Sequence, residues 1–111
     1  MAAAYELVKD ANVTITETIS DQDITAATIR WMLLEKLTDF STDLDDLTAL
    51  ISKTVGAGVT ITDGANGVFT VAIVPSDTED MRPQSYYVLI RCTLASGAIL
   101  PIEKYEMDVV I

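Results

Sequence analysis

Hydrophobic and polar residues alternate along much of the chain, with the period of two that is typical of half-buried β-strands. Residues 11–19 begin the pattern, and residues 85–93 carry its longest stretch. The closing run predicts one strand with an inward face of Tyr105, Met107, Val109 and Ile111, and an outward face of Lys104, Glu106 and Asp108. Six to eight such strands, separated by turn residues, predict an all-β fold.

The segment GVTITDGANGVF, residues 58–69, gives the strongest local prediction. Val59 and Ile61 alternate with threonines, and the alternation resumes at Phe69. Between the two runs stand glycine, alanine and asparagine, of which glycine and asparagine tolerate left-handed backbone. We therefore expect a hairpin whose connecting loop has about four or five residues.

Two other segments carry less regular patterns. Residues 28–40 fit a strand face formed by Ile29, Trp31 and Leu33, but they also fit a helical spacing. We favour the strand, because the neighbouring segments are strands. Residues 75–83 begin with a proline, which ends the preceding strand, and predict a single helical turn with Ser76 or Asp77 as its cap.

Composition narrows the classes of function. The 111 residues suit a single domain, 1–111, whose first residues, 1–11, can act as an N-terminal arm. Seventeen acidic and seven basic residues give a net charge of −10, which disfavours binding to nucleic acid and to anionic membranes. The first residues lack the features of a secretory signal, so we expect synthesis in a cytoplasm.

Catalytic and metal chemistry find little support in the sequence. There is no histidine, which excludes a serine–histidine dyad and a histidine-bearing zinc site, and Cys92 has no second cysteine for a disulfide within the chain. The carboxylates at 39–46 lack the glycine and glutamate of an EF-hand, so a solvated acidic loop is favoured over a calcium site. Nothing fixes the geometry of Glu79, Asp80 and Arg82 for acid–base catalysis. We expect no enzyme activity, no cofactor and no metal.

The order of several segments resembles a known family. DITAATIRWMLL is followed by ISKTVGAGVTITDGANGVFTVAIVPSDT, then by the tyrosine-led SYYVLIRCTLASG and a final strand. Together they are similar to the small immunoglobulin-like domain of tailed-phage virion proteins, including the N-terminal domain of phage baseplate upper proteins and short stand-alone phage structural proteins. The match is most specific over residues 51–78. The chain departs from the family at Ala26 and at Gln84, where a glycine is usual.

This resemblance implies an antiparallel immunoglobulin-like β-sandwich and a non-enzymatic structural component of a virion, in the tail, baseplate or head-to-tail adaptor. The implied partners are other virion structural proteins in a symmetric oligomeric assembly, without nucleic acid or membrane. A capsid decoration or cement protein is one alternative. Another is a carbohydrate-binding or adhesin module, which an exposed tryptophan would support.

The alternation also suggests where such a protein would contact its partners. If Trp31 and Ile90 face the core, apolar residues of the same strands point the other way, and apolar residues on the outer face of a strand often mark an interface. The first segment, AAAYELVKD, lies outside the resemblance and can lie against a neighbouring chain. The predicted interface residues are Tyr5, Leu7, Met32, Leu34 and Leu89.

Overall fold

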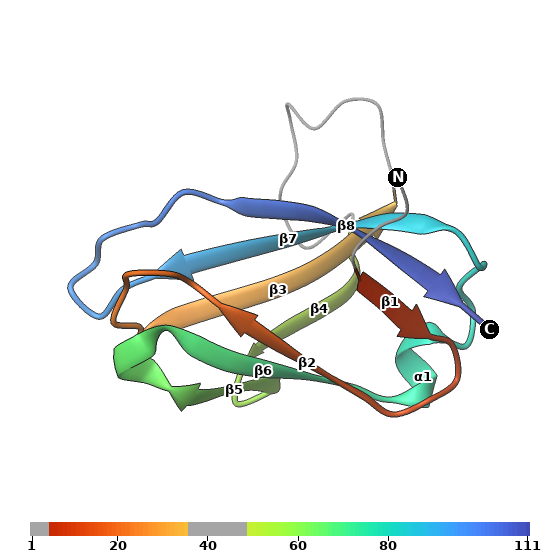
Figure 1. Cartoon of the computed structure of the whole chain (residues 1–111), viewed down its shortest axis with the longest axis horizontal. Helices are drawn as coiled ribbons and strands as arrows, with labels where there is room; N and C mark the ends of the chain where they lie inside the picture. The colour runs from red at the N-terminus through yellow and green to blue at the C-terminus, as the bar shows by residue number, and fades with distance from the viewer. Residues whose placement is uncertain (1–4, 36–48) are drawn as a thin grey trace.

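The computed structural model describes residues 5–35 and 49–111, and within them the chain is all-β, as the alternation predicts. Two short helical turns interrupt the strands (Figure 1). The elements are β1 (Tyr5–Val8), β2 (Val13–Thr18), β3 (Thr28–Glu35), β4 (Ala49–Val55), β5 (Gly58–Asp63), η1 (Gly64–Asn66), β6 (Val68–Ile73), α1 (Pro75–Thr78), β7 (Ser85–Thr93) and β8 (Glu103–Val110).

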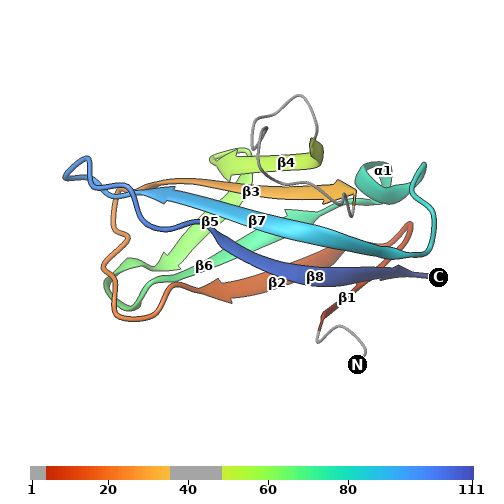
Figure 2. The same ribbon diagram turned by 90° about the horizontal axis from the view of Figure 1, so that it is seen from above.

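The strands form one mixed sheet in the order β1-β8-β7-β3-β4-β5-β6-β2. It curls so far that it is nearly a barrel, and its two ends approach each other (Figure 2). Two neighbouring pairs, β1 with β8 and β4 with β5, run parallel. The expectation of a purely antiparallel arrangement is therefore wrong for these pairs. The sequence pattern shows only that a strand forms, whereas its direction depends on how the chain crosses between distant strands.

The individual strand predictions agree closely with the structure. Residues 28–35 form β3, which pairs with both β4 and β7, so the helical alternative for this segment is wrong. In the predicted hairpin, Asp63 lies opposite Val68, and residues 64–67 make the connection. Gly67 has a φ of 74°, in the left-handed region that favours glycine. A side chain here would meet the carbonyl oxygen of Ile19.

The predicted helical turn is α1, which follows β6. The N-cap is Val74 and not Ser76 or Asp77, but the Asp77 carboxylate does accept a hydrogen bond from the Val74 N–H at 2.9 Å. The same carboxylate forms an ion pair with Lys53, at 2.8 Å. Asp77 thus ties the turn to β4.

One main hydrophobic core fills the inside of the curled sheet. Trp31, Phe69 and Ile90 are buried in it, together with Val71 and Cys92, as the alternation predicts. Met107 and Val109 of β8 also point inward. Ile111 does not: it lies beyond the last residue of β8 and is exposed.

Candidate functional site

The predicted N-terminal contact residues belong to the chain's own sheet. β1 pairs with β8 in parallel, and Tyr5 stands opposite Met107. Leu7 is completely buried in the main core. Its apolar side chain is therefore already covered within the domain, and its predicted contact with a neighbouring chain stays a prediction. An interface role for Tyr5 stays a prediction.

The other predicted interface residues form a second hydrophobic cluster. Met32 and Leu34 come from β3 and Leu89 from β7, and they lie apart from the main core. None is more than 2% exposed, so the expected open apolar surface is not formed by these side chains. Alternation indicates which face a side chain takes, but not whether that face is covered. Their contact with another protein stays a prediction.

A buried carboxylate links the two ends of the curled sheet. Glu17 of β2 faces inward and is 8% exposed. The indole N–H of Trp31 donates to its Oε2 at 3.0 Å, and the hydroxyl of Tyr105 donates to the same oxygen. Tyr105 belongs to β8, so β2 and β8 are joined here through side chains. Desolvation raises the pKa of Glu17. The two hydrogen bonds favour the carboxylate and lower the pKa, but desolvation is the larger effect.

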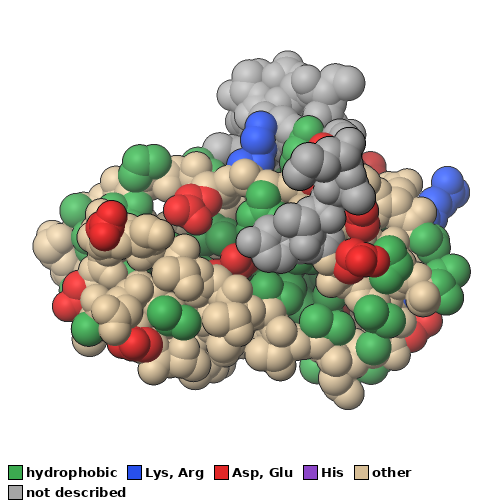
Figure 3. All heavy atoms as spheres, in the orientation of Figure 1, with side chains coloured by type: hydrophobic (Ala, Val, Ile, Leu, Met, Phe, Trp, Pro, Cys, Tyr) green, Lys and Arg blue, Asp and Glu red, His purple; other side chains and the backbone are tan. Residues whose placement is uncertain are grey.

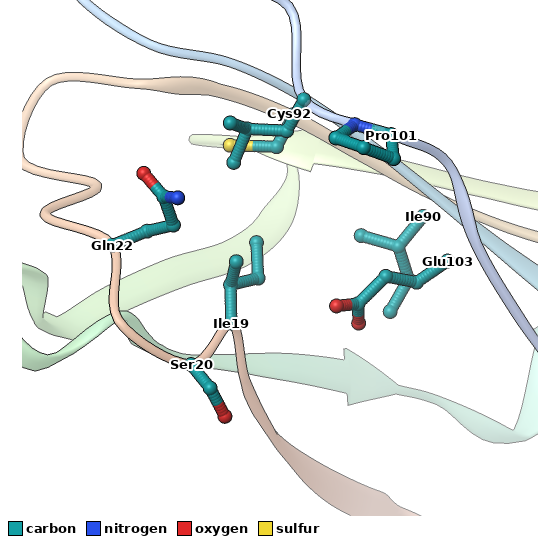
Figure 4. A pocket seen from close by; sticks show the side chains of 8 residues that line it. Ile19, Ser20, Gln22, Ile90, Cys92, Pro101 and Glu103 are labelled. Carbon is teal, nitrogen blue, oxygen red and sulfur yellow. The ribbon is translucent and has the colours of Figure 1, made fainter.

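An open cavity lies beside this link, at the end of β2 that leads into β3. Its volume is about 210 Å³, and Glu103, at the start of β8, stands on one side of it. Figure 4 shows the Ile19 side chain rising into the opening and the Glu103 carboxylate entering it from the side, with Cys92 above them. Burial and the nearby Glu103 raise the pKa of the Cys92 thiol, which keeps it protonated and unreactive. The cavity therefore suits an apolar group, with a positive charge placed at the mouth of the cavity beside Glu103.

Exposed apolar side chains gather on the segment between β7 and β8. Ile99 is 80% exposed and Ile102 40% exposed, and with Leu100 they line a hollow of about 300 Å³. We call these residues the 99–102 patch. Acidic side chains are scattered over the described surface seen in Figure 3, where basic ones are few. An apolar patch on an acidic domain is a candidate contact surface for another protein.

The sequence-predicted polar candidates do not assemble into a catalytic site. The acidic residues 39–46 lie outside the described residues. Glu79, Asp80 and Arg82 are exposed, which does not provide the dry surroundings of a general acid. Among residues 5–35 and 49–111, no cluster of three or more acidic or cysteine side chains is placed to hold a metal. In the same part of the chain, no helix has the length and apolar character to cross a membrane.

The tyrosines and the tryptophan take structural positions. Tyr86 is buried at the edge of the core, and its hydroxyl donates to the carbonyl of Arg82 at 2.8 Å. Trp31 is completely buried, so its ring has no exposed face on which a sugar could stack. The exposed tryptophan that would support the carbohydrate-binding alternative is therefore not provided by Trp31.

Sequence reasoning missed the cavity and the 99–102 patch. The run AILPIE does contain the signal for the patch, since three large apolar residues stand there without the alternation of a strand. The cavity left no such signal, because its walls come from three distant segments. Compared with known protein families, curated proteins and solved structures, the chain gives no match.

Proposed function

We propose that the protein is a non-enzymatic structural component of a tailed bacteriophage virion, in the tail, baseplate or head-to-tail region, where it packs against other virion proteins. The observation that carries the proposal is the 99–102 patch. Burying an exposed side chain such as Ile99 against a partner contributes about 1.5–3 kcal/mol. A small acidic domain that exposes such residues to water is stabilised when a neighbouring protein in an assembly buries them. The sequence resemblance over residues 51–78 supports a virion as that assembly.

We also infer that the curled sheet is an immunoglobulin-like sandwich of the variable type. In that fold the C, F and G strands form one sheet, which further strands extend, and the B, E and D strands belong to the other. The observed strand order is compatible with this arrangement: one side holds β1, β8, β7, β3 and β4, and the other holds β5, β6 and β2. Two side chains add support: Trp31 is buried on the third strand, and the Tyr86 hydroxyl binds a carbonyl four residues upstream, as in a tyrosine corner.

The test replaces apolar contact surface with charge. The double substitution Ile99→Asp with Ile102→Asp is placed in the native genome, and incorporation into purified particles is measured by immunoblot. We expect incorporation to fall by about tenfold or more, since two buried aspartates would oppose docking. The matched control, Thr60→Asp with Ala65→Asp, adds the same charge at exposed residues elsewhere and should leave incorporation unchanged. Normal incorporation of the patch variant would contradict the proposed surface.

A further inference from the structure

The edge of β2 has no neighbouring strand in the described part of the chain. β2 stands at one end of the sheet order, and among residues 5–35 and 49–111 it pairs with β6 alone. That pairing is regular, from Val13 opposite Ile73 to Thr18 opposite Val68, without a bulge. One side of β2 is therefore a regular strand edge without a bulge.

The hydrogen-bond pattern shows which backbone groups this edge presents. The N–H of Ile19 donates to the carbonyl of Gly67 at 2.8 Å, so Ile19 directs its backbone groups toward the β6 side. In an antiparallel pair this direction alternates from residue to residue. Thr14, Thr16 and Thr18 therefore direct their N–H and C=O groups outward. Their side chains are exposed as well.

Native sheets usually protect such an edge with a charged side chain, outward or inward, a proline, a bulge or a very short strand. β2 has six residues, and its outward side chains are all uncharged threonines. Its one charged residue, Glu17, points inward and is already bonded to Trp31 and Tyr105 within the domain. The strand at the opposite end of the sheet is different. β1 has only four residues and carries the exposed Glu6. Of the two terminal strands, β2 is thus the one left open to pairing.

The cavity of Figure 4 begins where this edge ends. Ile19, which lines it, directly follows β2, and Gln22, another lining residue, lies three residues further on. A strand laid along Thr14–Thr18 and continued by about two residues, at about 3.3 Å each, reaches its mouth. An apolar cavity of about 150 Å³ is large enough to hold benzene. The space of about 210 Å³ here accommodates one large aliphatic or aromatic side chain.

Charge decides what kind of segment fits. Glu103 stands at the cavity, and Asp21 and Asp23 are exposed on the loop beside it. A second copy of this chain would bring its own acidic loop and a further charge of −10 against them. Like charges disfavour that pairing, whereas a lysine or arginine opposite Glu103 is favourable.

We propose that the edge of β2 binds an extended segment of a different protein, which adds a strand to the sheet, inserts one large apolar side chain into the cavity and places a lysine or arginine beside Glu103. This proposal deepens the proposed function and rests on it for the source of the segment, another virion protein. Peptide binding is tested with the purified chain. The binding proposal can therefore fail while the virion role is confirmed, and the virion role can fail while peptide binding is confirmed.

The probe is a library of random ten-residue peptides, displayed on ribosomes and selected on the full chain. We expect enriched peptides with alternating β-branched or apolar residues, one large apolar residue and one basic residue. The decisive readout is amide hydrogen exchange in the unmodified protein. Binding should slow exchange at Thr14, Thr16 and Thr18 by about tenfold or more, while Ile15 and Glu17, already bonded to β6, change little.

Two substitutions complete the test. Thr16→Pro removes only an outward N–H, and an edge strand tolerates this change. It should weaken peptide binding by about tenfold, the loss expected for one hydrogen bond, and Thr16→Ala should bind normally. Glu103→Gln should weaken binding of the basic peptides and reduce their salt dependence. The proposal is overturned if no peptide is enriched, if exchange at the threonines does not change, or if the edge pairs with a second copy in sedimentation experiments.

Discussion

The contact between Trp31 and Glu17 permits a quantitative test of the core. Trp31→Phe removes the indole N–H and leaves the buried carboxylate with one donor fewer. A hydrogen bond to a charged group contributes about 1.5–3 kcal/mol, and one between neutral groups about 0.5–1.5 kcal/mol. We therefore expect Trp31→Phe to lower the free energy of unfolding by about 2 kcal/mol through this bond, with a further loss from reduced packing.

Glu17→Gln provides the matched background. Its amide carbonyl can accept from both Trp31 and Tyr105, so the geometry is kept while the charge is removed. In this background the hydrogen-bond part of Trp31→Phe should fall to about 1 kcal/mol. The packing loss is the same in both backgrounds and cancels in the double-mutant cycle. The coupling between the two substitutions is then about 1 kcal/mol when Glu17 is ionised.

The pH dependence has a definite sign. Because burial raises the folded-state pKa of Glu17 above its ordinary value of 4.5, the folded chain holds this proton more tightly than the unfolded chain. The contribution of Glu17 to stability is therefore greatest below pH 4.5 and decreases as the pH rises through the folded-state pKa. The stability of Glu17→Gln relative to the unmodified protein should rise over the same window.

Urea unfolding of the four proteins of the cycle gives both the coupling energy and the pH dependence of stability. Unfolding is followed by circular dichroism in all four proteins, and also by tryptophan fluorescence where Trp31 is present. A coupling of zero at the alkaline end would refute the hydrogen bond as an energetic link. Parallel pH profiles for Glu17→Gln and the unmodified protein would refute the raised pKa.

Four further substitutions test the fold. Tyr86→Phe removes the hydroxyl that binds the Arg82 carbonyl and should lower the free energy of unfolding by about 1 kcal/mol, measured by urea unfolding; an unchanged midpoint would contradict this. Leu7→Ala should lower it by about 2–5 kcal/mol, because Leu7 is completely buried, whereas a small effect would restore the idea of a detachable arm. Gly56→Ala should lower the melting temperature by the equivalent of about 1–2 kcal/mol, since its φ is positive but its surroundings are open. Gly67→Ala should lower it further, because the new side chain would meet the Ile19 carbonyl, and equal effects of the two alanines would contradict the tight turn.

Local pattern was enough to predict most strands. The alternation around Trp31 and Ile90 gave the faces of β3 and β7 correctly, because a strand that is buried on one side must place its side chains with a period of two. The glycine-rich turn before Val68 gave the hairpin for a similar local reason. These features depend on neighbouring residues only.

The features that escaped prediction depend on distant parts of the chain. The parallel pairing of β1 with β8, which buries Leu7, joins the two ends of the described chain and leaves no local signal. The inward Glu17 was visible in the alternation, but its donors come from β3 and β8. The burial of Met32 depends on what packs over its face of the sheet, and alternation does not encode that.

The most direct test of the proposed virion role is quantitative mass spectrometry of purified particles. Particles are isolated by density gradient from a lysate of cells that carry the chain in its native genome, and its copy number is measured relative to the most abundant coat protein. We expect a constant ratio across preparations, which persists after washing in high salt. Recovery of the chain only in the soluble fraction, with none in intact particles, would contradict it.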